Sequence, residues 1–196
     1  MRNANGNHKT AEKFNITFNN ASRSIPRGEI KRIIQNLDSS KKKYFNIIPS
    51  TTSTRHLTDL EFERVIEPRW TSNRCYLSGK CIRSCKKKAI QRGFGQNLIY
   101  LSENCDFCGR CVDVCPSGSW MAVRKGWAVW IGGKRGRYPL NSINVAEFVP
   151  DDEVPDIIER TYKWYRKNAT KNERFGDTLR EGGLTSLNHY IDNVFI

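Results

Sequence analysis

The chain has 196 residues, a length that suits one or two domains with a moderate buried core. Hydrophobic residues make up 38% of it, mean hydropathy is −0.64, and no apolar stretch approaches membrane-spanning length, so we expect a soluble protein that does not cross a membrane. The formal net charge of +13 has three competing explanations, namely an acidic or anionic partner, nucleic acid, or an ordinary solvated surface.

The first segment, residues 1–23, predicts a flexible N-terminal arm. Met1–Asn20 is rich in Asn and Lys and contains no apolar core stretch. It therefore resembles neither a secretory signal nor a twin-arginine leader, which favours a cytoplasmic protein whose thiols stay reduced.

A helix and two strands are predicted next. Ser24–Pro26 opens a helix that runs to Asp38, with Ile30, Ile33 and Ile34 on one face. Residues 43–49 and 62–68 have the composition of strands, and the polar run 50–54 between them predicts a loop.

The most specific motif of the chain is a run of four cysteines. They have the spacing C-x2-C-x2-C-x3-C and are followed at once by Pro116: Cys105, Cys108, Cys111 and Cys115. This spacing is typical of chains that wrap a cubane iron–sulfur cluster. One tight loop presents three thiolates, a helical turn carries the fourth away, and the proline ends that turn.

An imperfect copy of this run lies thirty residues upstream. Cys75, Cys81 and Cys85 fit the same pattern once Ser78 takes the place of a cysteine. All seven cysteines fall inside this duplication, which resembles two-cluster bacterial ferredoxins. In such repeats the fourth cysteine of each run ligates the cluster of the other run.

That resemblance implies two ligand sets. The first site, which is complete, takes four thiolates for a [4Fe–4S] cluster: Cys105, Cys108, Cys111 and Cys85. The second site combines Cys75, Cys81 and Cys115 with Ser78. Because a serine hydroxyl is a poorer ligand for iron than a thiolate, we expect a [3Fe–4S] cluster there or a labile [4Fe–4S] cluster. Tyr76, Phe107 and Trp120 are expected to shield the clusters from water.

Two other uses of clustered cysteines are weaker explanations. Disulfide frameworks belong to small secreted chains. Structural zinc sites usually pair two CxxC units around a longer spacer.

After the cysteines, the pattern alternates between strand and helix. Residues 121–131 predict a hairpin that turns at Lys125-Gly126. A helix over 152–167 begins with acidic and ends with basic residues, as the helix dipole favours. Shorter helices are expected at 174–181 and 184–194. The fold class is therefore α+β, with a ferredoxin-type module at 70–120 inserted into a domain formed by 24–69 and 121–196.

The segments that flank the cysteines carry a second resemblance. IKRIIQNLDSSKKKYFNI (30–47), RVIEPRW (64–70), WIGGKRGRYP (130–139) and WYRKNATKNERFGDTL (164–179) occur in that order. Together they resemble the C-terminal part of siroheme-containing nitrite and sulfite reductases, especially the anaerobic sulfite reductase C subunit. The resemblance covers residues 28–190 and implies a truncated reductase-like α+β domain that works with other reductase subunits.

The resemblance also implies a siroheme site, which this sequence matches only in part. Basic residues of the Gly-rich segment, Lys134, Arg135 and Arg137, either contact siroheme carboxylates or an anionic substrate, or form an exposed turn. These reductases couple siroheme to a cluster through a bridging cysteine, but residues 49–55, at the matching place, contain no cysteine. The family's N-terminal half is also missing.

Three functions follow from the sequence. The first is an iron–sulfur electron-transfer protein or subunit with an acidic redox partner. The second is a siroheme-dependent sulfite or nitrite reductase subunit. The third, a basic iron–sulfur protein that binds nucleic acid, has no recognised nucleic-acid motif to support it. No catalytic residue is assigned, since His8, His56 and His189 are scattered along the chain.

Overall fold

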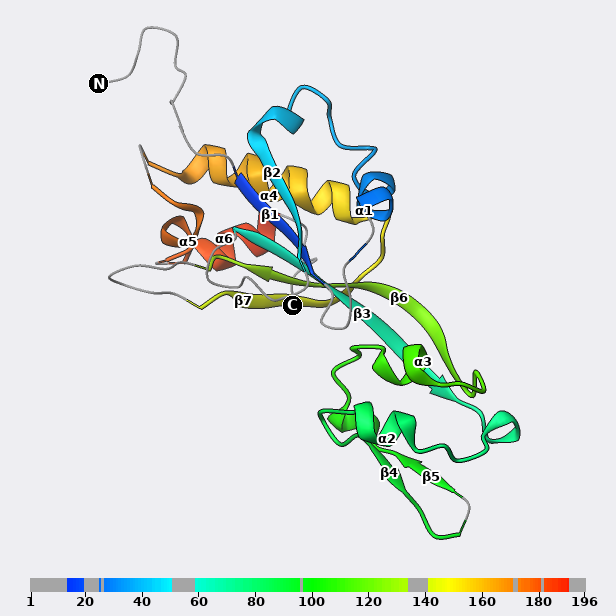
Figure 1. Ribbon diagram of the computed structural model, residues 1–196. Coiled ribbons are helices and arrows are strands. Elements are labelled where there is room, and N and C mark those ends of the chain that lie inside the picture. The colour runs from blue at the N-terminus through cyan, green and yellow to red at the C-terminus, as the bar shows by residue number, and fades with distance from the viewer. Residues whose placement is uncertain are drawn as a thin grey trace, which may run out of the picture.

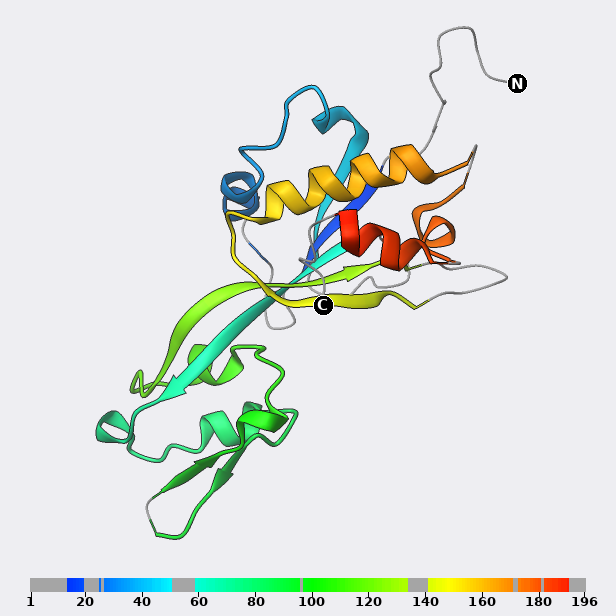
Figure 2. The same ribbon diagram turned by 180° about the vertical axis from the view of Figure 1, so that it is seen from behind.

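The computed structural model describes residues 14–19, 25, 27–50, 59–95, 97–133, 141–170, 173–180 and 182–190. A five-stranded mixed sheet has the order β2-β1-β3-β6-β7, and helices cover one of its faces (Figures 1 and 2). The strands are β1 Phe14–Asn19, β2 Phe45–Ser50, β3 Leu60–Trp70, β6 Trp120–Ile131 and β7 Ile143–Val149. The predicted α+β class is confirmed.

Strand β1 corrects the expectation of a flexible arm for residues 14–19, and the rest of the predicted arm, 1–13 and 20–23, lies outside the described residues. The strand pairs in parallel with both β2 and β3, so it lies inside the sheet. Phe14, Ile16 and Phe18 alternate along it and are buried in the main core. Thr17 and Asn19, which alternate with these residues, are also buried, and Asn19 donates a hydrogen bond to Glu61 (3.2 Å). The asparagines around this short apolar alternation concealed the strand.

Strands β3 and β6 form a long antiparallel ribbon, paired from Leu60↔Ile131 to Trp70↔Trp120. The predicted hairpin over 121–131 is therefore wrong. Gly126 marks a close approach instead of a turn, because a Cβ there would lie 2.6 Å from the Val149 oxygen and 2.7 Å from the Phe148 ring.

The helical layer contains α1 Arg27–Ile33, α4 Val154–Asn168, α5 Phe175–Thr178 and α6 Gly183–Tyr190. The prediction for α4 is confirmed, and its buried side includes Ile157, Ile158 and Trp164. Helix α1 is shorter than the predicted 24–38, since turns and the 3-10 helix Lys42–Tyr44 occupy much of the connection to β2. The end of the predicted helix 184–194 lies outside the described residues.

Arg64 of β3 connects the helical layer to the sheet through ion pairs and a ring contact. Its guanidinium lies 4.7 Å from the centre of the Trp127 ring and forms ion pairs with Glu29 (2.6 Å) and Asp151 (3.2 Å). The Trp127 indole donates to the same Asp151 carboxylate at 2.7 Å. Helix α1, the ribbon and the approach to α4 therefore meet at one partly buried charge.

The cysteine repeat, residues 70–120, lies at the far end of the β3–β6 ribbon (Figure 1). Its elements are the 3-10 helices Ser72–Arg74 and Ser102–Asn104, α2 Lys80–Ser84, β4 Ile90–Arg92, β5 Leu98–Tyr100 and α3 Arg110–Val114. It has a small apolar cluster of its own, made of Cys81, Ile90, Leu98, Cys111 and Trp120. Among the described residues, no helix is both long and apolar enough to span a membrane.

Candidate metal centre

The duplication seen in the cysteine spacing is repeated in the backbone. Helices α2 and α3 pack together, and each follows a left-handed glycine, Gly79 (φ 69°) and Gly109 (φ 70°). Left-handed conformations recur at matched positions thirty residues apart: Leu77 and Phe107, Lys88 and Gly118. Such conformations are strained for Leu, Lys and Phe, so the surrounding structure must hold them in place.

The loop that carries the first three cysteines of the complete run is braced by strand β3. The Ile66 amide donates to the Phe107 carbonyl at 2.6 Å, and Ile66 forms a β-bridge with Cys108. The Phe107 amide in turn donates to the Cys105 sulfur at 3.4 Å. A bond of this kind favours a thiolate ligand over a thiol. Sequence reasoning missed Ile66, because nothing local links it to the cysteines.

The thiols of this loop resist ionisation in the absence of a cation. Burial, with the nearby Cys105 and Cys108, raises the pKa of Cys111 to about 12. Burial also raises the pKa of Cys108 to about 11. Burial raises the pKa of Tyr100 as well, and the nearby Cys105 adds to that effect. Iron bound here would favour the thiolate forms, so the donor set fits an iron–sulfur cluster.

The residues of the Ser78 run line a small cavity of their own. Cys75, Ser78, Cys81 and Cys115 all line it, together with Trp120. Cys115 therefore lies with the other run, which is the crossed arrangement expected of the duplication. Burial raises the pKa of Cys81, and the neighbouring Cys115 and Cys75 add to that effect.

Cys85, the fourth ligand expected at the first site, accepts a hydrogen bond from the Ala89 amide at 3.2 Å. Its assignment to the group of Cys105, Cys108 and Cys111 stays a prediction. Within the described part of the chain, no three His, Cys, Asp or Glu side chains are close enough to hold one metal ion.

The aromatic side chains expected to shield the clusters differ in their placement. Trp120 is buried, with 2% of its surface exposed, whereas Tyr76 is 65% exposed and shields little. Ser117 and Ser119, which sequence reasoning passed over, lie beside the second site. The Ser117 hydroxyl is 3.5 Å from the Cys115 sulfur and 2.8 Å from the Ser119 hydroxyl.

A cleft of about 670 Å³ separates the first site from the open face of the sheet. The Cys105–Cys108 loop forms one wall, while β3, β6 and β7 contribute the other. Its charged lining is mainly acidic: Glu63, Glu103, Asp106 and Glu147 against Arg64 and Lys87.

Two of the flanking motifs meet in space. A Cβ on Gly176 would lie 2.8 Å from the Gly132 oxygen, so the end of β6 packs directly on α5. The predicted siroheme or substrate contacts of the same Gly-rich segment, Lys134, Arg135 and Arg137, lie outside the described residues.

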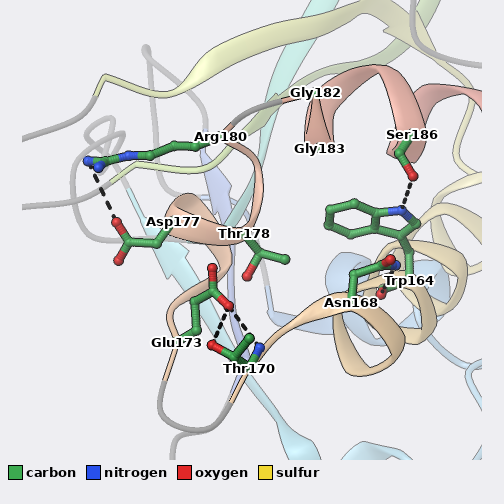
Figure 3. Close-up of a pocket in the computed structure, with 10 residues that line it drawn as sticks. All are labelled: Trp164, Asn168, Thr170, Glu173, Asp177, Thr178, Arg180, Gly182, Gly183 and Ser186. Carbon is green, nitrogen blue, oxygen red and sulfur yellow. Dashed lines mark hydrogen bonds and ion pairs between the residues drawn. The ribbon is translucent and has the colours of Figure 1, made fainter.

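A hollow of about 580 Å³ lies beside α4, α5 and α6, within the last flanking motif (Figure 3). Several of its polar side chains already have partners within the chain. Trp164 donates to Ser186 (3.1 Å), Glu173 accepts from the amide and hydroxyl of Thr170 (2.7 Å each), and Asp177 pairs with Arg180 (3.6 Å). The Trp164–Ser186 bond joins α4 to α6, and the other contacts are local to the segment between them.

Comparison with known proteins agrees with the fold and the cysteine motif. Residues 5–194 match the family described as the nitrite and sulphite reductase 4Fe-4S domain, so the chain belongs to that family. Membership supports an iron–sulfur cluster in this protein.

Individual relatives are more distant. The chain is 26% identical over 94 residues to the alpha subunit of a dissimilatory-type sulfite reductase from Megalodesulfovibrio gigas, a match covering 44% of this chain and 46% of that protein. It is 27% identical over 67 residues to an assimilatory-type sulfite reductase from Nitratidesulfovibrio vulgaris, covering 34% and 31% respectively. The crystal structure of dissimilatory sulfite reductase I superposes with a TM-score of 0.59 at 12% identity, covering 86% of this chain and 47% of the other. The matches thus span less than half of each relative.

Proposed function

We propose that this chain is an iron–sulfur electron-transfer protein or subunit related to the sulfite and nitrite reductases. The observation that carries the proposal is the crossed grouping of the duplicated runs, in which Cys115 lies in one cavity with Cys75, Ser78 and Cys81. By the same duplication, Cys85 joins Cys105, Cys108 and Cys111 at a complete [4Fe–4S] site. The Ser78 site holds a [3Fe–4S] or a labile [4Fe–4S] cluster.

When bound, such clusters accept and release single electrons, at potentials that span roughly −700 to +450 mV among proteins. The chain holds the thiolates, donates backbone hydrogen bonds to their sulfurs and excludes water with buried groups such as Trp120.

The charge distribution supports docking of an acidic partner or another reductase subunit. Lys86, Lys87 and Lys88 directly follow Cys85 and are exposed. A positive surface beside a redox centre speeds encounter with an acidic protein. One relative named above is itself a subunit of a sulfite reductase.

A siroheme-dependent reductase subunit is the second candidate, favoured by the cleft between the first site and the sheet. Two features weigh against it. The acidic lining repels a cofactor with many carboxylates, and residues 49–55 contain no cysteine to bridge cluster and siroheme. In this second function, Lys134, Arg135 and Arg137 would supply the missing positive charge.

The proposal is tested on protein purified without oxygen, by iron and sulfide analysis, absorbance and EPR. We expect about seven to eight iron atoms per chain and a broad cluster absorbance without the intense bands of siroheme. Cys108→Ala should remove the first-site cluster and about half of the iron. The matched Ser78→Ala should leave the iron content within about one atom of wild type.

Three results would contradict the proposal in different ways. Siroheme bands would favour the reductase. A single cluster in the wild-type chain would remove the second site. Full iron content in Cys108→Ala would show that the ligand assignment is wrong.

A further inference from the structure

The segments that hold the first three positions of each run differ in charge. Residues 72–84, which contain Cys75, Ser78 and Cys81, include three basic residues and no acidic one: Arg74, Lys80 and Arg83. The matched residues 102–114, which contain Cys105, Cys108 and Cys111, include three acidic residues and one basic one: Glu103, Asp106, Asp113 and Arg110. Lys86, Lys87 and Lys88, which follow the crossed ligand Cys85, offset the acidic charge at the first site and leave it less basic than the Ser78 site. Because reduction adds negative charge, basic surroundings raise a reduction potential and acidic surroundings lower it.

Hydrogen-bond donors are also distributed unequally. Trp120 lines the Ser78 cavity, and its indole nitrogen is buried without a hydrogen-bond partner among the described residues. The indole N–H is therefore free to donate to a sulfur of a cluster bound in this cavity. The residue thirty positions earlier is Ile90, whose side chain has no donor.

Ser117 supplies a second donor on the same side. Its hydroxyl lies 3.5 Å from the Cys115 sulfur, and a thiolate ligand there can only accept the hydrogen bond. The matched residue, Lys87, is exposed. At another matched pair the halves are balanced, since Tyr100 carries a hydroxyl and Trp70 keeps a buried indole N–H.

From these asymmetries we infer that the Ser78 site has the higher reduction potential of the two, so that electrons delivered by a one-electron reductant collect there. The inference rests on the proposed function, because it needs a cluster at each site. Charge, hydrogen bonding to sulfur and the weaker serine ligand distinguish the two sites, and the first two act in the stated direction.

The test is an anaerobic redox titration followed by EPR. A signal that survives Cys108→Ala is assigned to the Ser78 site. In the wild-type protein, that signal should show reduction at a higher potential than the first-site signal. Trp120→Phe combined with Ser117→Ala should lower the Ser78-site potential and leave the first-site potential in place. The expected change is about tenfold in the equilibrium for electron transfer between the sites, or 59 mV for a one-electron couple.

A charge exchange gives a second variant, which leaves the Trp120 and Ser117 donors in place and removes the Arg83 bond to the Ser78 carbonyl. Arg83→Asp with Asp113→Arg exchanges the charges at two matched positions and keeps the net charge of +13. It should narrow the difference between the two potentials. Ile90→Val is the control and should move neither potential.

The possible failures are distinguishable. Iron analysis that finds one cluster contradicts the proposed function before any potential is measured. Two clusters with equal or inverted potentials overturn the inference alone. The inference is also overturned if the Ser78-site potential is unchanged, at full iron content, in both double variants.

Discussion

Two matched glycines of the cysteine repeat have the same backbone conformation and different surroundings. Gly79 and Gly109 have φ values of 69° and 70°, so a side chain at either position strains the backbone by about 1 kcal/mol. A Cβ on Gly109 would also lie 2.6 Å from Cδ1 and 2.9 Å from Cβ of Ile66, which cannot both move aside. On Gly79 it would meet the flexible end of Arg83 at 3.1 Å.

Gly109→Ala should therefore be the more damaging of two chemically identical substitutions. We expect it to destabilise the cysteine repeat by about 2–4 kcal/mol and to remove most of the first-site iron, since the Phe107–Cys108 loop must leave Ile66. Gly79→Ala should cost about 1 kcal/mol and leave the first site filled. Iron analysis and thermal unfolding measure both effects. Equal losses in the two variants would contradict the bracing role of Ile66.

At the residue level, the sequence revealed the candidate ligands and little of what surrounds them. Cysteine spacing is set by local chain geometry, so the duplication and the odd Ser78 could be recognised from the sequence. Ile66 and Gly109 meet only through tertiary packing. Ser117 lies only two residues after Cys115 in the sequence, but its approach to the Cys115 sulfur needed the fold.

At the level of elements, the long amphipathic helix was the easiest to predict. Helix α4 has a continuous apolar side and charges that suit its dipole. Strands failed where a short pattern had two explanations. The Lys125-Gly126 pair is common in turns, but Gly126 in fact allows β7 to approach β6. The strand character of β1 depends on its two neighbours in the sheet, which no local window contains.

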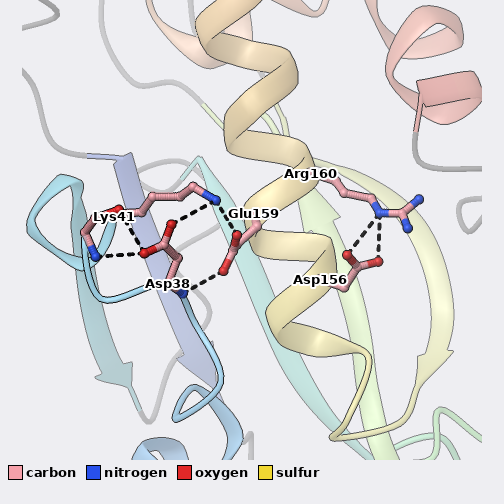
Figure 4. A network of polar contacts seen from close by, with 6 residues as sticks. Asp38, Lys41, Asp156, Glu159 and Arg160 are labelled. Carbon is pink, nitrogen blue, oxygen red and sulfur yellow. Dashed lines mark hydrogen bonds and ion pairs between the residues drawn. The ribbon is translucent and has the colours of Figure 1, made fainter.

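A polar network ties the connection between α1 and β2 to α4 (Figure 4). Glu159 accepts from the Asp38 amide at 2.7 Å and pairs with Lys41 at 2.5 Å, while Lys41 also reaches Asp38 at 3.4 Å. Burial alone would raise the pKa of Glu159. The hydrogen bonds from Lys41 and from the Asp38 amide, with the Lys41 charge, together outweigh burial and leave that pKa lowered. Hydrogen bonds from Ser40 lower the pKa of Asp38.

These shifts give the network a defined pH dependence. A carboxyl whose pKa is lowered on folding contributes stability above its unfolded value, here 4.5 for Glu159 and 3.8 for Asp38. That contribution is lost as the pH falls through the folded values. Glu159→Gln should therefore melt about 1–3 °C below wild type at pH 7, and the difference should shrink below pH 4.5.

Thermal unfolding followed by circular dichroism, at equal cluster content, measures this difference. Cluster loss in acid affects both proteins alike, so their difference reports the network. Arg160→Gln is the control, because it breaks an exposed pair with Asp156 on the same helix (2.8 Å). If the difference in melting temperature between wild type and Glu159→Gln instead grew in acid, the charged Glu159 would stabilise the fold less than the protonated form does, which would contradict the stabilising role of the ion pair.

On the scale of the whole molecule, stability is divided between two apolar clusters. The main core joins both ends of the sheet to α4, with Phe14, Tyr162 and Phe175 in edge-on ring contacts. The cluster of the cysteine repeat has five buried members, two of which are cysteines. A unit of about fifty residues with so small a core needs added cross-links, and thiolate–iron bonds would supply them.

Removal of iron should therefore unfold the cysteine repeat and spare the sheet. Hydrogen exchange before and after treatment with a chelator should show lost protection over 71–119, with β1 and α4 still protected. The ribbon crosses between the two parts, and its register shifts at Glu67/Pro68, where a proline also interrupts the hydrogen-bond ladder. The loss of protection should stop near this irregularity. Loss of protection in β1 together with the repeat would mean that the two apolar clusters unfold as one unit. In that case the Cys108→Ala variant should lose protection in β1 without any chelator.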